Sequence, residues 1–159
     1  MTGFLAIAFA ASPPPSPDDL VPHECEECSD LRRDFSGHTV WSLPPAAIHE
    51  HFGDLALLSP SAFRYFLPAY LQVALNCTPG TKDEMVRQFV LYSLVPQPDS
   101  DHSWYEARFR TFTQPEVAAI VQALEALATD PRHAYDHDEA QQALTVWRAR
   151  LHRLSERGA

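Results

Sequence analysis

Apolar residues recur at the spacing of an α-helix along most of this chain, whereas the strict alternation typical of strands is scarce. The clearest stretch is residues 57–75, LLSPSAFRYFLPAYLQVAL, where large apolar and aromatic side chains follow one another at helical intervals. Ser59 can cap a helix, and Pro60 suits the first helical position because its missing N–H would be unpaired there. The pattern predicts a long helix whose apolar stripe is buried.

Helical spacing also marks residues 25–35, 42–53, 81–95, 113–127 and 137–156. Residues 104–112 fit a helix as well, with a short strand as the alternative. The sequence therefore predicts a single compact all-α domain of about five to six helices over residues 23–159.

Two of the expected helices begin with a capping pattern. Thr113 and Glu116 have the spacing of a capping box, in which each side chain accepts a backbone N–H of the other residue. Asp136 and Glu139 repeat this spacing before the last helix. We expect both acidic pairs to serve as helix starts.

The first 22 residues differ in composition from the rest of the chain. Residues 3–11 form a short apolar run, and residues 12–22 contain five prolines. This predicts an apolar, proline-rich and disordered leader over residues 1–22. Export through the apolar run is a weaker alternative to a cytoplasmic location, because no Lys or Arg precedes the run. No window approaches the length of apolar sequence that an integral membrane protein needs.

Charge and cysteine content narrow the classes of partner. The formal net charge of −9 over 159 residues opposes binding to nucleic acid and anionic membranes, and it favours a basic protein partner. The cations of residues 148–157 complement the dipole at the end of the last helix.

Three cysteines are too few, and odd in number, for a disulfide framework, which is consistent with a reducing compartment.

One motif suggests metal binding. In HECEEC, Cys25 and Cys28 have the spacing of a zinc knuckle, and His23 adds a third ligand. A structural zinc site needs four ligands, so Cys77 or one of His38, His49 and His51 would have to complete it. The alternative is a pair of partly buried thiols at the start of a helix. The neighbouring glutamates raise thiol pKa values, which opposes a role as reactive redox cysteines.

Other candidate residues give weaker signals. His51 would be the centre of a small hydrolase if the fold brought a carboxylate and a nucleophile to it. Arg64 and Tyr65 fall outside the apolar stripe of residues 57–75 and are of types enriched at protein interfaces. No nucleophile elbow, phosphate loop or dinucleotide fingerprint is present in the sequence.

Three segments together resemble a family of small uncharacterised bacterial proteins. These are HECEECSDLRRDFSG, the approach from His51 to Leu58, and LLSPSAFRYFLPAYLQVAL, with TFTQPEVAAIVQALEAL as a more degenerate continuation. The resemblance implies a helical domain and brings no established activity, so it assigns no catalytic residue. The apolar run before His23 departs from the family's pattern, which suggests a translation start downstream of Met1 or an appendage.

These observations favour a protein-binding accessory or immunity-like factor that acts through an acidic helical surface. The small size, the negative charge and the lack of a complete catalytic set motivate this expectation. The alternatives are a zinc-binding structural or regulatory module using His23, Cys25 and Cys28, and a small hydrolase around His51.

Overall fold

The fold was analysed in a computed structural model, which describes residues 3–96 and 102–157. Within these ranges the regular structure is entirely helical, which confirms the predicted all-α domain. The α-helices are α1 (Gly3–Ala8), α2 (Glu26–Phe35), α3 (Pro45–Glu50), α4 (Pro60–Asn76), α5 (Asp83–Ser93), α6 (His102–Phe109), α7 (Gln114–Ala128) and α8 (His137–Arg157). Short 3₁₀ helices lie at η1 (Pro17–Asp19), η2 (Asp54–Leu57) and η3 (Pro131–Asp136).

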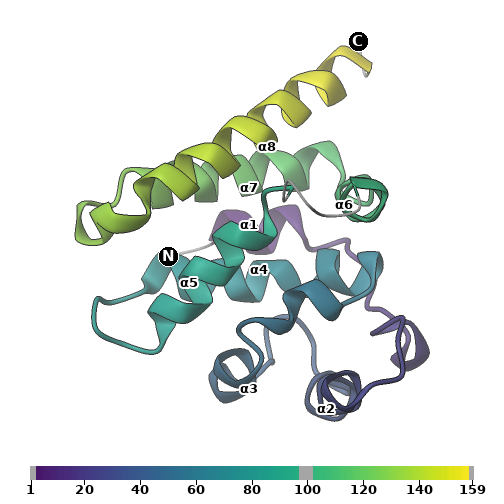
Figure 1. The fold of residues 1–159 in the computed structure, drawn as a ribbon. Helices are drawn as coiled ribbons and strands as arrows, with labels where there is room; N and C mark the ends of the chain where they lie inside the picture. The colour runs from purple at the N-terminus through teal and green to yellow at the C-terminus, as the bar shows by residue number, and fades with distance from the viewer. Residues whose placement is uncertain (1–2, 97–101, 158–159) are drawn as a thin grey trace.

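The helices form layers around α4. Helices α7 and α8 form a hairpin through η3 on one side, and α2 and α3 lie on the other (Figure 1). Helix α5 packs beside α4 and also contacts α8. One continuous hydrophobic core joins these layers.

Helix α4 is the buried helix that the sequence predicted. The Ser59 side chain accepts the N–H of Ala62 at 3.2 Å, and Pro60 occupies the first turn. The interior of the helix contributes Phe63, Phe66 and Tyr70 to the core. A start signal and an apolar stripe lying in one segment therefore sufficed to predict it.

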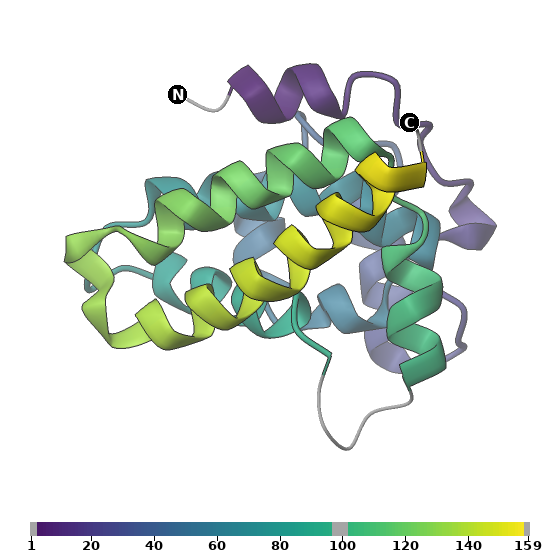
Figure 2. The same cartoon turned by 90° about the horizontal axis from the view of Figure 1, so that it is seen from above.

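The N-terminal segment differs from the disordered leader that the sequence predicted. Residues 3–8 form helix α1, which lies along α7 (Figure 2). Leu5 is 0% exposed and Phe9 is buried against the ring of Phe112. The apolar run of residues 3–11 thus covers α7, because burying its large side chains removes apolar surface from water.

Residues 104–112 were ambiguous between helix and strand. In the structure α6 covers His102–Phe109, so the helical alternative is confirmed. None of the described helices is both long and apolar enough to cross a membrane.

Candidate functional site

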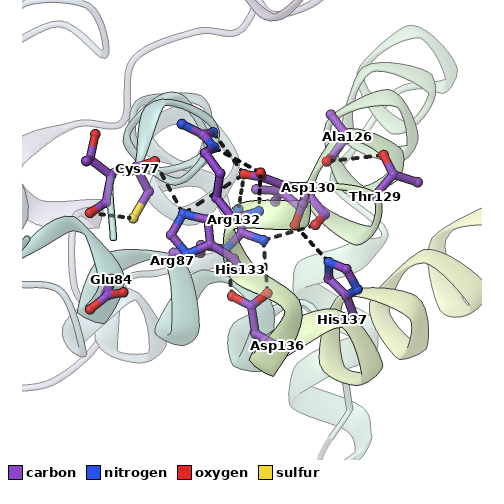
Figure 3. Close-up of polar contacts among 12 residues, drawn as sticks. Cys77, Glu84, Arg87, Ala126, Thr129, Asp130, Arg132, His133, Asp136 and His137 are labelled. Atoms are coloured by element: carbon purple, nitrogen blue, oxygen red, sulfur yellow. Dashed lines mark hydrogen bonds and ion pairs between the residues drawn. The ribbon is translucent and has the colours of Figure 1, made fainter. Parts of the chain in front are cut away.

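A buried cation organises the corner where α5 meets η3 and the start of α8 (Figure 3). The guanidinium of Arg87 is fully buried and donates from Nε to Asp136 Oδ2 at 2.6 Å and from Nη2 to Asp136 Oδ1 at 2.9 Å. Nη2 also donates to the Leu127 carbonyl at 2.9 Å. A bidentate pair supplemented by a carbonyl is the geometry that offsets the cost of burying a guanidinium.

This pairing corrects the predicted role of Asp136. The sequence suggested that Asp136 caps α8, but both of its carboxylate oxygens accept hydrogen bonds from Arg87. Arg87 was not singled out as a candidate, although it lies on the same face of its helix as Val90 and Leu94. A cation on an apolar helical face was the signal that pointed to it.

Asp130 connects the buried cation to the surface. It lies 3.5 Å from Arg87 Nη1 and accepts hydrogen bonds from Arg132 Nε and Nη2, each at 2.9 Å. The hydrogen bonds from Arg132 hold the pKa of Asp130 at about 2, against the opposing effect of burial. Asp130 therefore stays ionised at neutral pH and holds η3 in place.

His133 joins the end of α4 to η3. Its Nε2 faces the Cys77 carbonyl at 3.3 Å, and a carbonyl oxygen can only accept, so this nitrogen carries a proton. Its Nδ1 lies 3.2 Å from the Tyr135 hydroxyl, which lies 3.2 Å from Glu84 Oε1. Burial, followed by the charge of Glu84, raises the pKa of Tyr135 to about 12, so the hydroxyl remains protonated.

Beside this polar corner lies a groove of about 690 Å³ between α5 and the η3–α8 turn. Apolar and aromatic side chains from α5 and the residues after it form one wall, and Tyr135 stands on the opposite rim. Tyr92 is 55% exposed and Tyr135 is 52% exposed, so both rims present aromatic rings to solvent. The lining residues are Gln88, Phe89, Leu91, Tyr92, Val95, Tyr135, Asp136, Glu139 and Gln142.

The groove is acidic as well as apolar. Asp136 and Glu139 are the charged residues in its described lining, which includes no Lys, Arg or His. Because Asp136 is paired with Arg87, Glu139 is the lining carboxylate left to face an incoming group. These features suit an apolar side chain of a binding partner that has basic residues beside it.

His51 lies in a different site, between α2 and η2. Its Nδ1 contacts Asp54 Oδ2 at 2.9 Å and its Nε2 contacts Asp34 Oδ2 at 3.0 Å. Burial alone would lower the pKa of His51, but hydrogen bonds to Asp34 and Asp54 outweigh it and raise the pKa. A histidine that donates from both nitrogens has no lone pair for general-base catalysis, so this geometry does not support the hydrolase hypothesis.

The residues of the expected zinc site do not come together. Cys25 and Cys28 lie at the start of α2, whereas Cys77 is buried at the end of α4 beside η3. The backbone carbonyl of His23 accepts a hydrogen bond from Arg32 Nη2. Across residues 3–96 and 102–157, no three His, Cys, Asp or Glu side chains are grouped so that they could hold a metal ion.

Arg64 and Tyr65 both make contacts within the fold, Arg64 from a partly exposed position and Tyr65 from a buried one. Arg64 Nε donates to both oxygens of Glu116 at 3.0 Å, and Nη2 donates to Oε1 at 2.9 Å. Tyr65 is only 7% exposed and its ring packs edge-on against Phe66. Tyr65 therefore belongs to the packing of α4 and Arg64 is paired with Glu116, while an interface role for the two residues stays a prediction.

Comparison with known proteins places the chain in a family without assigning it an activity. Residues 20–151 match DUF6714, a family of unknown function, and the chain belongs to this family. No match was found among curated proteins or among solved structures.

Proposed function

We propose that this protein binds a basic segment of another protein in the groove between α5 and the η3–α8 turn. It would act as an accessory or immunity-like factor that masks a positively charged surface of its partner. The observation that carries the proposal is the composition of the groove, which combines exposed aromatic rims, an apolar wall and the carboxylate of Glu139.

The aromatic rims supply the binding energy in this proposal. Tyrosine side chains bury a large area at low entropic cost and are enriched among the residues that dominate protein interfaces. Tyr92 and Tyr135 stand on opposite sides of the groove, where an inserted apolar side chain would contact both rings.

The charges supply orientation and encounter rate. A net charge of −9 attracts basic partners over distances of about a Debye length, roughly 8 Å at physiological salt, and Glu139 places negative charge at the groove itself. Rim charges act mainly on the association rate and on specificity.

A protein segment fits this groove better than a small polar ligand. Small-ligand sites contain polar groups that converge on the ligand and fix its orientation. Here Asp136 is committed to Arg87, and the Tyr135 hydroxyl is committed to Glu84 and His133. The groove therefore offers mainly ring faces and apolar surface, together with an acidic rim.

The test is affinity capture from cells that express the protein naturally, using the wild type and two charge-reversal variants. Glu139→Lys changes a residue that lines the groove, whereas Asp138→Lys makes the same change at the adjacent exposed position outside the lining. We expect a partner with a basic segment to be captured by the wild type and by Asp138→Lys, and to be lost or strongly reduced with Glu139→Lys. Equal capture by both variants, or no partner with the wild type, would contradict the proposal.

A further inference from the structure

The two cysteines at the start of α2 lie outside the groove lining and form a separate pair. Cys25 is the N-cap of the helix, with an extended backbone (φ −143°, ψ 173°), and its Sγ accepts the N–H of Cys28 at 3.2 Å. An N-cap residue and the third residue of the helix lie at a separation that a disulfide can bridge without unwinding the turn.

The two sulfurs differ in their access to solvent. Cys28 is 0% exposed and lies against the core, whereas Cys25 is half-buried. Cys77, the remaining cysteine of the chain, is fully buried and lies beside His133 at the end of α4. Solvent therefore reaches the pair through Cys25. Cys28 is the thiol positioned to react with the sulfur of Cys25.

An arginine holds the chain entering the pair. Arg32 Nη2 donates to the Val21 carbonyl and to the His23 carbonyl, each at 3.2 Å, and Arg32 also forms an ion pair with Glu24 at 2.9 Å. These contacts fix residues 21–24 against the first turns of α2. The backbone on both sides of the two sulfurs is thereby restrained, which favours an intramolecular bond over separation of the thiols.

We propose that Cys25 and Cys28 form a reversible disulfide by exchange with a small-molecule disulfide of the glutathione class. The Cys25 thiolate attacks one sulfur of the oxidant and expels one thiolate, leaving a mixed disulfide on Cys25. The Cys28 thiol then loses its proton to solvent and attacks the Cys25 sulfur, expelling the second thiolate. The protein gives up two electrons and two protons, and the oxidant becomes two thiols.

The burial of Cys28 affects the equilibrium between the dithiol and the disulfide. Burial, with a smaller effect from Cys25, raises the pKa of Cys28 to about 11, so the reduced pair gains little from a stabilised thiolate. Oxidising dithiols are those whose reduced form is stabilised, and this pair lacks that stabilisation. The raised pKa of Cys28 therefore opposes rapid thiol catalysis, and it also favours the disulfide over the dithiol at equilibrium.

The test is equilibration of the purified full-length chain in mixtures of reduced and oxidised glutathione, followed by acid quenching, alkylation of free thiols and intact mass measurement. The wild type and Cys77→Ser should each lose about 2 Da without adding an alkyl group at Cys25 or Cys28, and excess reductant should reverse the change. Cys25→Ser, which keeps an oxygen at the N-cap position, should remain fully alkylated at Cys28.

A further variant tests the order of attack. In Cys28→Ser the reaction should stop at a stable glutathione adduct on Cys25, detected by peptide mapping. The proposal fails if the wild type remains a dithiol in excess oxidised glutathione. It also fails if the wild type accumulates the same unresolved adduct as Cys28→Ser. Neither outcome depends on whether the groove binds a partner.

Discussion

At the scale of single residues, the surroundings of a charged side chain determine what its removal costs. Arg87 and Arg132 share Asp130 as a partner, but Arg87 is fully buried and Arg132 is half-exposed. Removing a buried partner leaves an uncompensated charge in the interior, whereas an exposed partner is replaced by water. The two arginines should therefore contribute very differently to stability.

We predict that Arg87→Met lowers the free energy of unfolding by about 3–5 kcal/mol, because Asp136 would lose its bidentate partner in a buried position. The matched control Arg132→Met should leave the free energy of unfolding almost unchanged, because Arg132 is exposed and water can replace it. Urea unfolding followed by circular dichroism measures both values. Equal losses in the two variants would show that the buried pair is not a main support of this corner.

His51 is held as an imidazolium by two carboxylates. Hydrogen bonds from Arg33 and then from His51 lower the pKa of Asp34 to about 2, so this carboxylate is ionised whenever the protein is folded near neutral pH. His51 has the opposite shift, since its folded pKa lies above the unfolded value. The contribution of His51 to the free energy of unfolding is therefore fully present below the unfolded pKa and is lost as the pH rises through the folded pKa.

We predict that His51→Gln costs about 1–3 kcal/mol near pH 6 and that this cost shrinks as the pH rises from there through the folded pKa of His51, which lies above its ordinary value. Chemical denaturation of both proteins across this range measures the difference. His152→Gln removes an exposed histidine that pairs with Glu156, and its cost should be much smaller than that of His51→Gln near pH 6. A difference for His51→Gln that grows with pH would contradict the assigned protonation state.

At the scale of elements, helices with local signals were predictable, and those that depend on distant contacts were not. Helix α7 starts at the expected capping box, where Glu116 accepts the Thr113 N–H at 2.7 Å. The Arg87–Asp136 pair joins residues 49 positions apart, and Ser12 reaches Glu116 across 104 positions. Sequence periodicity within one segment contains no information about such partners.

The groove was missed for a related reason. The apolar stripe of residues 81–95 predicts a helix but does not show which of its rings stay accessible: Phe89 is only partly buried, and its ring packs against Phe52. Tyr92 lies outside that stripe, and an off-stripe aromatic was the available signal. Pairing it with Tyr135 requires the turn between α7 and α8 to approach α5, which only the folded chain establishes.

The docking of α1 on α7 gives a prediction at this scale. Leu5 is fully buried whereas Ile7, on the same short helix, is 80% exposed. Leu5→Ala should destabilise the protein by about 2–5 kcal/mol through the lost apolar burial and the cavity left behind. Ile7→Ala should be nearly neutral. Thermal unfolding of both variants compares them, and equal small effects would mean that α1 does not contribute to the core.

At the scale of the whole molecule, negative charge and exposed aromatic surface coincide at the groove. Glu139, in the first turn of α8, lines the groove together with the exposed ring of Tyr135. Elsewhere, arginines of α8 and α2 pair with carboxylates such as Glu125 and Asp30. The proposed binding mode therefore combines a screened electrostatic contribution with an unscreened apolar one.

Two substitutions separate these contributions once the partner is purified. Tyr92→Ala should weaken binding at least about 30-fold, equivalent to about 2 kcal/mol, at both low and high salt. Met85→Ala, at an exposed position of α5 outside the groove lining, should have little effect. Calorimetry at two ionic strengths measures both. A Tyr92→Ala effect that disappears at high salt would contradict the role of the aromatic rim.

The most direct measurement is site-specific photo-crosslinking in cells that express the protein naturally. A photoreactive residue would replace Gln142, which lines the groove, or Gln141, its exposed neighbour outside the lining. We predict a crosslink from position 142 to a basic segment of a partner protein, and none from position 141. Equal crosslinking from both positions, or none from position 142, would contradict the assignment of the groove as the binding site.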